Sequence, residues 1–551
     1  MDPILIQILR NKIGSLVEEM HYHFYRSGYS TIIRESRDFS CVILDRDGRL
    51  IVAPPMFFHA PVYRHFVGRI LALYGRGGIA EGDVFVSNHP YEAGMPHVSD
   101  MGFVAPVFAD GRLVAFSGSI AHKADVGGAV PGSTSATATE MYHEGILLPP
   151  IKIWAQGKPL RDVERIILTN SRQPELMRGD IHAQIAATRM GAERVRALCD
   201  RFGADTVTDA FAAILKGAAD ELRAAIAKLP EGASAAEGYL DNDGIDVNRP
   251  IKLAVSVTIK DGTAHFDFSE SDPQARGPVN LRPSMVEACV FYSLIGSLGP
   301  DIAFNDGMRD VVRLTYAPHT ILNADPPGPV SSYQMVNLLL ADVILEALAH
   351  FNPKRALAHC GASSALSIAW SKGRPGQTTQ QYEIAGSAYG GGMGHDGATG
   401  TATHLSNLHT TPIEVLESEF PCRILRFDFV PDSGGPGRWR GGLAIRREYE
   451  LLEDAVVIRR FNKTQFPPKG VAGGGAGARA RFVVCVGTDR EYETKASARV
   501  EMRAGERFLL QSAGGGGYGD PRQRDRAALR RDIAEGYVTP DAALRDYGAG
   551  G

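Results

Sequence analysis

Apolar side chains at helical spacing mark the beginning of the chain. They recur every three or four residues from Ile6 to Met20, which is the period of one face of an α-helix. Asp2 is a suitable N-cap and Pro3 a suitable first helical residue. The pattern therefore predicts a long amphipathic helix that starts at Pro3 and ends before Gly28.

A strand and a hairpin are predicted next. The segment Ile32–Asp47 is apolar in its second half and closes with an Asp-Arg-Asp-Gly turn at Asp45–Gly48, which indicates a buried strand. Further on, Met101–Phe108 and Arg112–Ser119 flank Ala109–Gly111, whose Asp-Gly pair is a strong hairpin signal.

Helical and strand-like patterns alternate in the remainder of the chain. The predicted elements are a helical region over 180–229 broken at Gly203–Asp205, a hairpin around Asp261-Gly262, a buried helix over Ser331–His350, a strand- and glycine-rich region over 360–480 and a charged helical segment over Pro521–Tyr547. Together they predict a mixed α/β (α+β) fold with mainly antiparallel or mixed sheets and long flanking helices. We expect three regions: 1–240, 241–520 and 521–551.

Length and composition narrow the class of protein. A chain of 551 residues exceeds a single typical domain, and 44% hydrophobic with 22% charged residues is typical of a soluble globular protein. The net charge of −4 argues against nucleic acid or an anionic membrane as partner. No apolar run approaches the roughly 20 residues of a membrane span. Six scattered cysteines and no signal-peptide pattern favour reduced thiols in the cytoplasm.

The predicted hairpin at 101–119 carries metal-competent residues at its open end. His97 and Asp100 lie just before its first strand, and His122 and Asp125 lie just after its second. A hairpin brings its outer ends together, and imidazoles with carboxylates suit Zn, Mn or Fe. Such a site could support hydrolysis or activate a carbonyl. The alternative, in which these histidines are only structural, stays open from spacing alone.

Three glycine clusters could be mistaken for a nucleotide site. They are Tyr389–Gly392, Gly473–Gly475 and Gly514–Gly517. None has the spacing of a phosphate-binding loop, and none joins a strand to a helix in a βαβ unit. We therefore expect sharp turns and close backbone packing there, and no nucleotide site in this chain.

Motifs along nearly the whole chain resemble the B subunit of the hydantoinase/oxoprolinase family, which includes N-methylhydantoinases, caprolactam-type lactamases and acetone and acetophenone carboxylases. The motifs are Arg37–Cys41, Gly82-Asp83, Asn88–Tyr91, His97-x-x-Asp100, Ala121–Asp125, Pro131–Ser133, Pro300–Ile302, Asn305–Gly307, Asp432–Gly435, Arg440–Gly442 and Gly514–Pro521.

The resemblance implies a divalent transition metal in this chain. By position His97 and His122 are ligands. Asp100 and Asp38 compete for the carboxylate role: one is a ligand, and the other is a catalytic residue that orients water or a histidine ring. Asp125 is expected to contact the ligands without binding the metal itself. Where the family commonly reads Asn-Asp-Pro-Tyr, this chain has His89 in place of the acid. His89 is then either a third imidazole near the metal or a surface or packing residue.

The resemblance also implies a partner. ATP-Mg would bind a kinase-like hydantoinase A subunit, which phosphorylates the substrate. The expected function is the metal-bearing B subunit of an ATP-dependent cyclic amide hydrolase, with metal hydroxide attacking the phosphorylated ring. The alternatives are a subunit of an ATP-dependent ketone carboxylase of the acetophenone type and a non-catalytic scaffold. We expect a hetero-oligomer of AB pairs, with the N-terminal helix and Gly514–Asp520 as contact regions.

Overall fold

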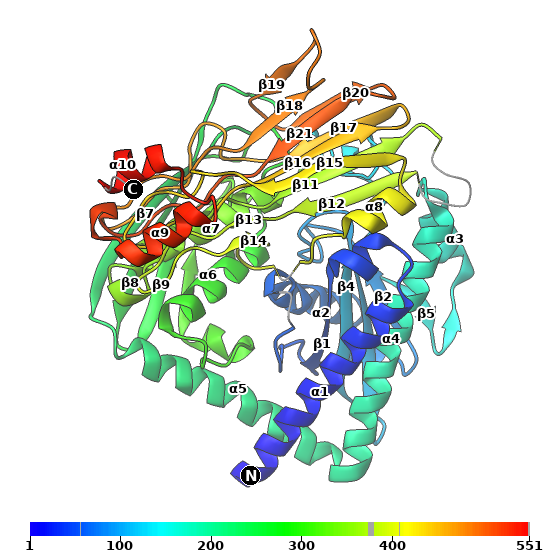
Figure 1. The fold of residues 1–551 in the computed structure, drawn as a ribbon. Helices are drawn as coiled ribbons and strands as arrows, with labels where there is room; N and C mark the ends of the chain where they lie inside the picture. The colour runs from blue at the N-terminus through cyan, green and yellow to red at the C-terminus, as the bar shows by residue number, and fades with distance from the viewer. Residues whose placement is uncertain (55–56, 373–378, 407, 549–551) are drawn as a thin grey trace.

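An antiparallel sheet of six strands forms the N-terminal part of the protein (Figure 1). The computed structural model describes residues 1–54, 57–372, 379–406 and 408–548. In spatial order the strands are β1 (Phe39–Asp45), β4 (Arg112–His122), β3 (Asp100–Ala109), β2 (Val84–Ser87), β5 (Ile151–Ala155) and β6 (Lys158–Pro159). The predicted hairpin is β3–β4, and both strands extend to the residues singled out as ligands.

Helices cover both faces of this sheet. Successive residues of β1 point to opposite faces: Cys41 packs in the cluster formed with α1 and α4, whereas Val42 packs in the cluster formed with α2. The helices are α1 (Pro3–Ser27), α2 (Ala60–Tyr74), α3 (Arg161–Thr169), α4 (Pro174–Phe202) and α5 (Ala204–Ile226). The helix predicted at the N-terminus and the break at Gly203 are both confirmed.

A second sheet lies beside the first. Its order is β10 (Val312–Thr315), β9 (Thr263–Asp267), β8 (Ile251–Lys260) and β7 (Gly232–Leu240), with β10 parallel to β9. The helices α6 (Pro283–Leu298) and α7 (Tyr333–Leu348) pack between the two sheets. One hydrophobic cluster runs from the first sheet through α2, α6 and α7 to the second, so these parts share a core.

Two further sheets pack on one another in the C-terminal half (Figure 1). The first contains β12 (Gln380–Ala385), β11 (Ser364–Trp370), β17 (Ala455–Arg460) and β20 (Ala498–Met502). The second contains β15 (Cys422–Phe429), β16 (Ile445–Leu451), β21 (Arg507–Gln511), β18 (Arg481–Val484) and β19 (Tyr492–Thr494). A small pair of strands and three short helices complete the half: β13 (Ser387–Ala388), β14 (Thr399–Thr401), α8 (Ile413–Glu419), α9 (Arg526–Ala534) and α10 (Pro540–Tyr547).

Short π-helical and 3₁₀-helical turns connect some of these elements. They are a π-helical turn at Ile32–Ser36 and 3₁₀ turns at Phe57–His59, Arg76–Gly78, Met141–His143, Asp306–Asp310, Pro353–Arg355 and Pro521–Gln523.

The glycine clusters are packing devices. Gly515 donates its N–H to the carbonyl of Gly442, Gly517 donates to that of Gly475, and Gly514–Gly517 are buried. A Cβ on Gly514 would lie 1.8 Å from the carbonyl oxygen of Ser433. The prediction of close backbone packing is confirmed. The expectation that this segment contacts a partner is wrong for Gly514–Gly517, because the chain itself buries them.

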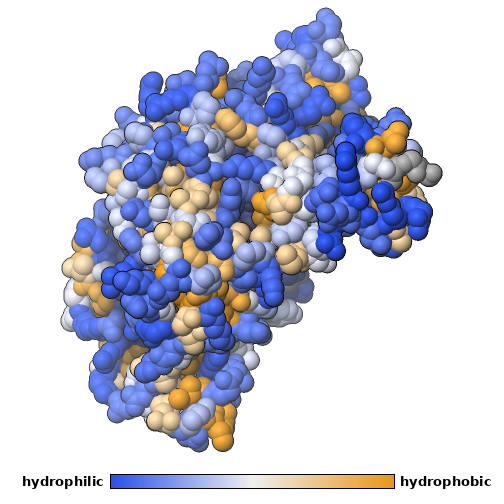
Figure 2. All heavy atoms as spheres, turned by 90° about the vertical axis from the view of Figure 1, so that its left-hand side faces the viewer, coloured by the Kyte–Doolittle hydropathy of each residue, from blue (hydrophilic) through white to orange (hydrophobic). Residues whose placement is uncertain are grey.

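The surface is mainly polar where Figure 2 shows it. Hydrophilic side chains cover most of the face that carries the second sheet and the C-terminal helices, with small hydrophobic groups between them (Figure 2). Among the described residues, no helix is long and apolar enough to cross a membrane. All six cysteines are buried and none forms a disulfide.

The packing of Gly514 can be tested by adding one methyl group. Gly514→Ala should cost about 3 kcal/mol or more, because the methyl group meets backbone atoms that cannot move aside. The measurement is the melting temperature of the full chain. The control is Gly217→Ala on the exposed face of α5, where no atom lies within 4 Å of the added Cβ. That change should stabilise the protein by about 0.4–1 kcal/mol. Equal melting temperatures for the two variants would contradict the close packing.

Candidate metal centre

The open end of the β3–β4 hairpin brings three sequence motifs together. Asp100, the first residue of β3, lies directly opposite His122, the last residue of β4. Residues opposite one another in an antiparallel pair share a face of the sheet. On the other side of β4, the N–H of His122 donates to the carbonyl of Asp38 at 3.1 Å. His97 lies in the loop before β3, where its carbonyl accepts from the N–H of Asp100 at 3.2 Å.

The side chains of His97, Asp100 and His122 converge on one point. Nε2 of His97 lies 3.2 Å from Oδ1 of Asp100 and 3.2 Å from Nδ1 of His122, and that Nδ1 lies 3.3 Å from the same carboxylate oxygen. Ligand atoms that each lie about 2.0–2.2 Å from one ion are themselves about 3–3.5 Å apart. All three residues are at least 97% buried. The arrangement fits a divalent metal ion.

Buried polar atoms without hydrogen-bond partners gather around this point. They belong to Asp38 (Oδ1), Asp100 (Oδ2), His122 (Nε2) and His59 (Nε2). His59 also lies 3.6 Å from Oδ2 of Asp100. Buried polar groups are almost always satisfied in folded proteins, so a cluster of orphaned atoms indicates a site that takes a ligand.

Second contacts orient the two imidazole rings. Nδ1 of His97 faces the carbonyl oxygen of Ser331 at 3.3 Å, which favours a proton on Nδ1 and leaves the Nε2 lone pair facing Asp100. The ring of His122 stacks on the ring of Tyr382, with centroids 4.5 Å apart. Tyr382 comes from β12, so the C-terminal half of the chain holds a ligand of the N-terminal half.

The charges at this point suit a cation. Burial lowers the pKa of His122 to about 4, so its ring is neutral near pH 7. Burial alone would raise the pKa of Asp100, but the surrounding His97, His122 and His59 hold it well below its ordinary value. Burial and the neighbouring Asp100 raise the pKa of Asp38 well above its ordinary value. A carboxylate grouped with the neutral His122 ring and further imidazoles is a typical environment for a transition metal.

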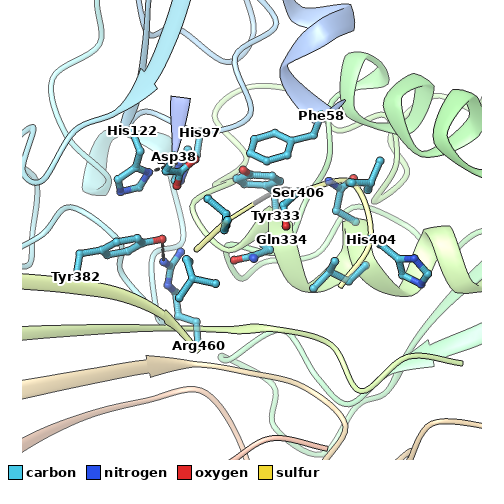
Figure 3. A pocket seen from close by; sticks show the side chains of 15 residues that line it. Asp38, Phe58, His97, His122, Tyr333, Gln334, Tyr382, His404, Ser406 and Arg460 are labelled. Carbon is cyan, nitrogen blue, oxygen red and sulfur yellow. Dashed lines mark hydrogen bonds between the residues drawn. The ribbon is translucent and has the colours of Figure 1, made fainter. Parts of the chain in front are cut away.

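A pocket opens beside the three residues. Figure 3 shows His97, His122 and Asp38 at one end, Tyr382 and Arg460 below them, and His404 at the opposite end. The wall comes from the start of α7, from β12 and β17, and from His404–Ser406 and Leu408. The candidate centre therefore lies where the N-terminal sheet, α7 and the C-terminal sheets meet.

Two residues singled out from the sequence do not join this group. The Asp125 carboxylate accepts from the backbone N–H of Gly127, Gly132 and Arg172, and it also pairs with the Arg172 guanidinium, so it holds the loop after β4. Nδ1 of His89 accepts from the N–H of Tyr91 and Glu92 in a local turn. Both side chains therefore stabilise the backbone of their own loops.

A second group of metal-competent residues consists of Asp342, Cys360 and His404. Here the carboxylate is already satisfied. One oxygen of Asp342 accepts from the Cys360 N–H and lies 2.9 Å from Nε2 of His404, and the other pairs with Lys463 at 3.4 Å. Because its oxygens already accept hydrogen bonds and a lysine lies beside it, this carboxylate has a structural role and is not a candidate metal ligand.

Three residues at the site carry no recognisable sequence signal. His59 is not part of a sequence motif in which a second histidine or carboxylate follows at the spacing of metal ligands. Tyr382 and Arg460 lie over 250 residues from His122 in the chain. Only the long-range packing of β12 and β17 against the hairpin brings the last two there.

A family model described as hydantoinase B/oxoprolinase matches residues 2–521. The chain belongs to this family. It is 31% identical over 572 residues to the putative B subunit of a D-/L-hydantoinase from Pseudomonas sp. (strain NS671), a match that covers 100% of this chain and 95% of the relative. It is 29% identical to the beta subunit of the caprolactamase from Pseudomonas jessenii, covering 100% of this chain and 96% of that relative.

Two solved structures share the fold. The crystal structure of the ATP-dependent caprolactamase from Pseudomonas jessenii matches with a TM-score of 0.91 at 28% identity, covering 100% of this chain and 96% of that chain. A nucleotide-free acetone carboxylase structure matches with a TM-score of 0.89 at 18% identity, covering 100% of this chain and 80% of that chain, which shows the fold alone. The resemblance and the mixed α/β fold expected from the sequence are thus confirmed.

The metal site predicts a clear effect of removing either imidazole. Wild-type protein should hold about one transition-metal ion per chain, and His97→Ala or His122→Ala should lower metal affinity by at least about tenfold, because each removes a ligand. Elemental analysis after dialysis against limiting Zn or Mn measures this. His350→Ala, at an exposed position after α7, is the control and should keep its metal. Unchanged metal content in both site variants would refute the assignment.

Proposed function

We propose that this protein is the metal-bearing B subunit of an ATP-dependent enzyme that hydrolyses cyclic amides of the hydantoin, oxoproline or lactam type. The observation that carries the proposal is the buried group His97, Asp100 and His122, with orphaned atoms around it, at the end of a pocket. Membership of the hydantoinase B/oxoprolinase family supplies the reaction class. The partner is a kinase-like A subunit that carries ATP-Mg and phosphorylates the substrate.

His97, Asp100 and His122 would hold a Zn, Mn or Fe ion. When bound, such an ion lowers the pKa of a coordinated water toward neutrality and polarises a nearby oxygen. Asp100 supplies the carboxylate ligand, since its oxygen lies between both imidazoles. Asp38 faces the same pocket with a free oxygen. A cation beside Asp100 would offset the negative charge that raises the pKa of Asp38, so an ionised Asp38 would be suited to accept the proton of the attacking water.

The chemistry balances in two additions of water. In the first, the oxygen of water bonds to the ring carbon whose oxygen carries the phosphoryl group. The ring C–N bond then breaks, and its electron pair goes to the nitrogen, which takes up a proton. The product is an acyl phosphate with a free amine. A second water replaces the phosphate, which leaves with the electron pair of the broken bond. Phosphorylation supplies the leaving group that an amide lacks.

The division of labour requires a stable complex. A phosphorylated intermediate made on one protein and consumed on another is lost to water if it crosses open solvent, so a shielded path between the sites preserves it. The relatives are themselves named as B and beta subunits. We place the pair in the cytoplasm as a hetero-oligomer of AB units. Exposed Ile4, Ile8 and Tyr22 on α1 are candidates for the contact.

The second candidate is a ketone carboxylase, in which the same centre holds a phosphorylated enol or carboxy-phosphate. The acetone carboxylase likeness shows that the fold is compatible with such an enzyme. A carboxylase consumes bicarbonate and forms a C–C bond, whereas a hydrolase yields an amino acid from a lactam. A scaffold without chemistry would not need the buried metal ligands.

The experiment is phosphate release and product formation by the complex of this chain with its kinase-like partner. Lactams, hydantoins and ketones are supplied with and without bicarbonate. We expect ring-opened product that requires ATP, this chain and its metal together, and no ATP turnover by this chain alone. Carboxylated ketone as the product would favour the second candidate, and full activity after loss of both His97 and His122 would leave only a scaffold.

The role of Asp38 can be separated from that of the ligands. Asp38→Asn should keep the metal but lower turnover about 10²- to 10⁴-fold, because the amide cannot accept a proton. The control is Asp162→Asn at an exposed position in the first turn of α3, which should leave both unchanged. If Asp38→Asn loses the metal instead, Asp38 is a ligand and the proton acceptor lies elsewhere.

A further inference from the structure

Arg460 stands at the end of β17 with its guanidinium in the pocket (Figure 3). It is only 4% exposed. One terminal nitrogen donates to the carbonyl of Ser331 at 2.5 Å, and the other donates to the hydroxyl of Tyr382 at 3.1 Å. Both partners also touch the candidate ligands: Ser331 accepts from His97, and Tyr382 stacks on His122. The guanidinium is therefore fixed beside the metal centre.

This buried cation makes no ion pair among the described residues. The buried Glu144 feels its charge, but burial raises the pKa of Glu144 to about 8, so Glu144 is neutral near pH 7. Within the part of the chain that the structure describes, no carboxylate lies at ion-pair distance from Arg460. The buried Arg447 and Arg524 each pair with a carboxylate, Glu383 at 2.7 Å and Asp532 at 2.6 Å, whereas Arg459 is bonded to backbone carbonyls away from the pocket. Arg460 differs from all three because it lines the pocket. A buried charge without a counterion is strongly destabilising unless a ligand supplies that counterion.

The donor geometry indicates what such a counterion is. A guanidinium has five N–H donors in a planar fork, and the two contacts above leave three of them. A fork of this kind matches two oxygens of a phosphate or carboxylate. A divalent ion held by Asp100 would add two positive charges to that of Arg460, so the positive charge in the pocket would exceed the negative charge even with Asp38 ionised. A phosphoryl group offers three oxygens and can meet the guanidinium fork and a neighbouring cation together, whereas a carboxylate offers only two.

We propose that Arg460 binds the phosphoryl group of the activated substrate and so selects the phosphorylated form at the metal centre. The inference rests on the proposed function and assigns its substrate-recognition residue. Tyr382 and the Ser331 carbonyl act as positioning groups that hold the guanidinium ready before the substrate arrives. Recognition through a fixed arginine avoids the entropy loss of ordering a flexible side chain on binding.

The test is calorimetric titration of the full chain, loaded with one equivalent of Mn²⁺, with inorganic phosphate and separately with acetate. Arg460→Met should weaken phosphate binding about 10- to 100-fold through loss of charge-assisted hydrogen bonds, and Arg460→Lys should fall between, because it keeps the charge but loses the fork. The matched control is Arg459→Met. Arg459 is buried next to Arg460 but donates to backbone carbonyls of Arg481 and Gln511, on the other face of β17.

Phosphate affinity should be unchanged in Arg459→Met, and metal content should be unchanged in all variants that fold. If Arg460→Met does not fold, Arg460→Lys tests the inference instead, and its phosphate affinity should be lower than that of the wild type. Phosphate binding that is undetectable in the wild type, or equal in wild type and Arg460 variants, overturns the inference. So does acetate binding that is tighter than phosphate binding and depends on Arg460.

These outcomes are separable from the proposed function. If the metal is retained and phosphate affinity does not depend on Arg460, only the assignment of this residue is refuted. Loss of any metal requirement, or ring opening that needs no ATP, sinks the proposed function whatever Arg460 does.

Discussion

The pairing of Asp100 with His122 across the β3–β4 hairpin is the constraint on which the candidate centre depends. A slip of one residue would turn one of these side chains to the opposite face of the sheet. Burial of both faces prevents such a slip, because every residue from Phe39 to Leu44 on the neighbouring β1 is buried in the packed interior. The same register on the other side of β4 sets Asp38 beside His122. Packing far from the site therefore fixes the geometry of the ligands.

The hairpin supplies the ligands, but distant parts of the chain complete the site. The segment before α7 contributes the Ser331 carbonyl that orients His97, and the C-terminal sheets contribute Tyr382 and Arg460. Those sheets reach this position through glycine segments whose backbones touch, as at Gly514 and Ser433. Stability and function are thus coupled: a methyl group in the glycine packing displaces the same half of the chain that holds His122 against its stacking partner.

Local signals were enough to predict α1, the two hairpins, the break between α4 and α5, and α7, because turns and periodicity are encoded within about 20 residues. They were not enough for α6, which is buried nearly all round and so lacks a polar stripe, or for the parallel pairing of β10 with β9. At the site, the hairpin signal correctly brought His97, Asp100 and His122 together. His-x-x-Asp spacing alone also placed Asp125 at the open end of the hairpin, whereas its carboxylate bonds to the backbone of the following loop.

Electrostatics explains why the centre would need both a cation and an anion from outside. Asp100 is a buried carboxylate among imidazoles, and Arg460 is a buried guanidinium bonded only to neutral oxygens. A metal ion compensates the first, and its second positive charge then adds to that of Arg460. An unphosphorylated lactam carries no charge and leaves this excess unbalanced, whereas a phosphorylated one neutralises it. On the proposed assignments, the pocket favours the substrate only after ATP has been spent on it, which links hydrolysis to phosphorylation through binding energy rather than through a moving part.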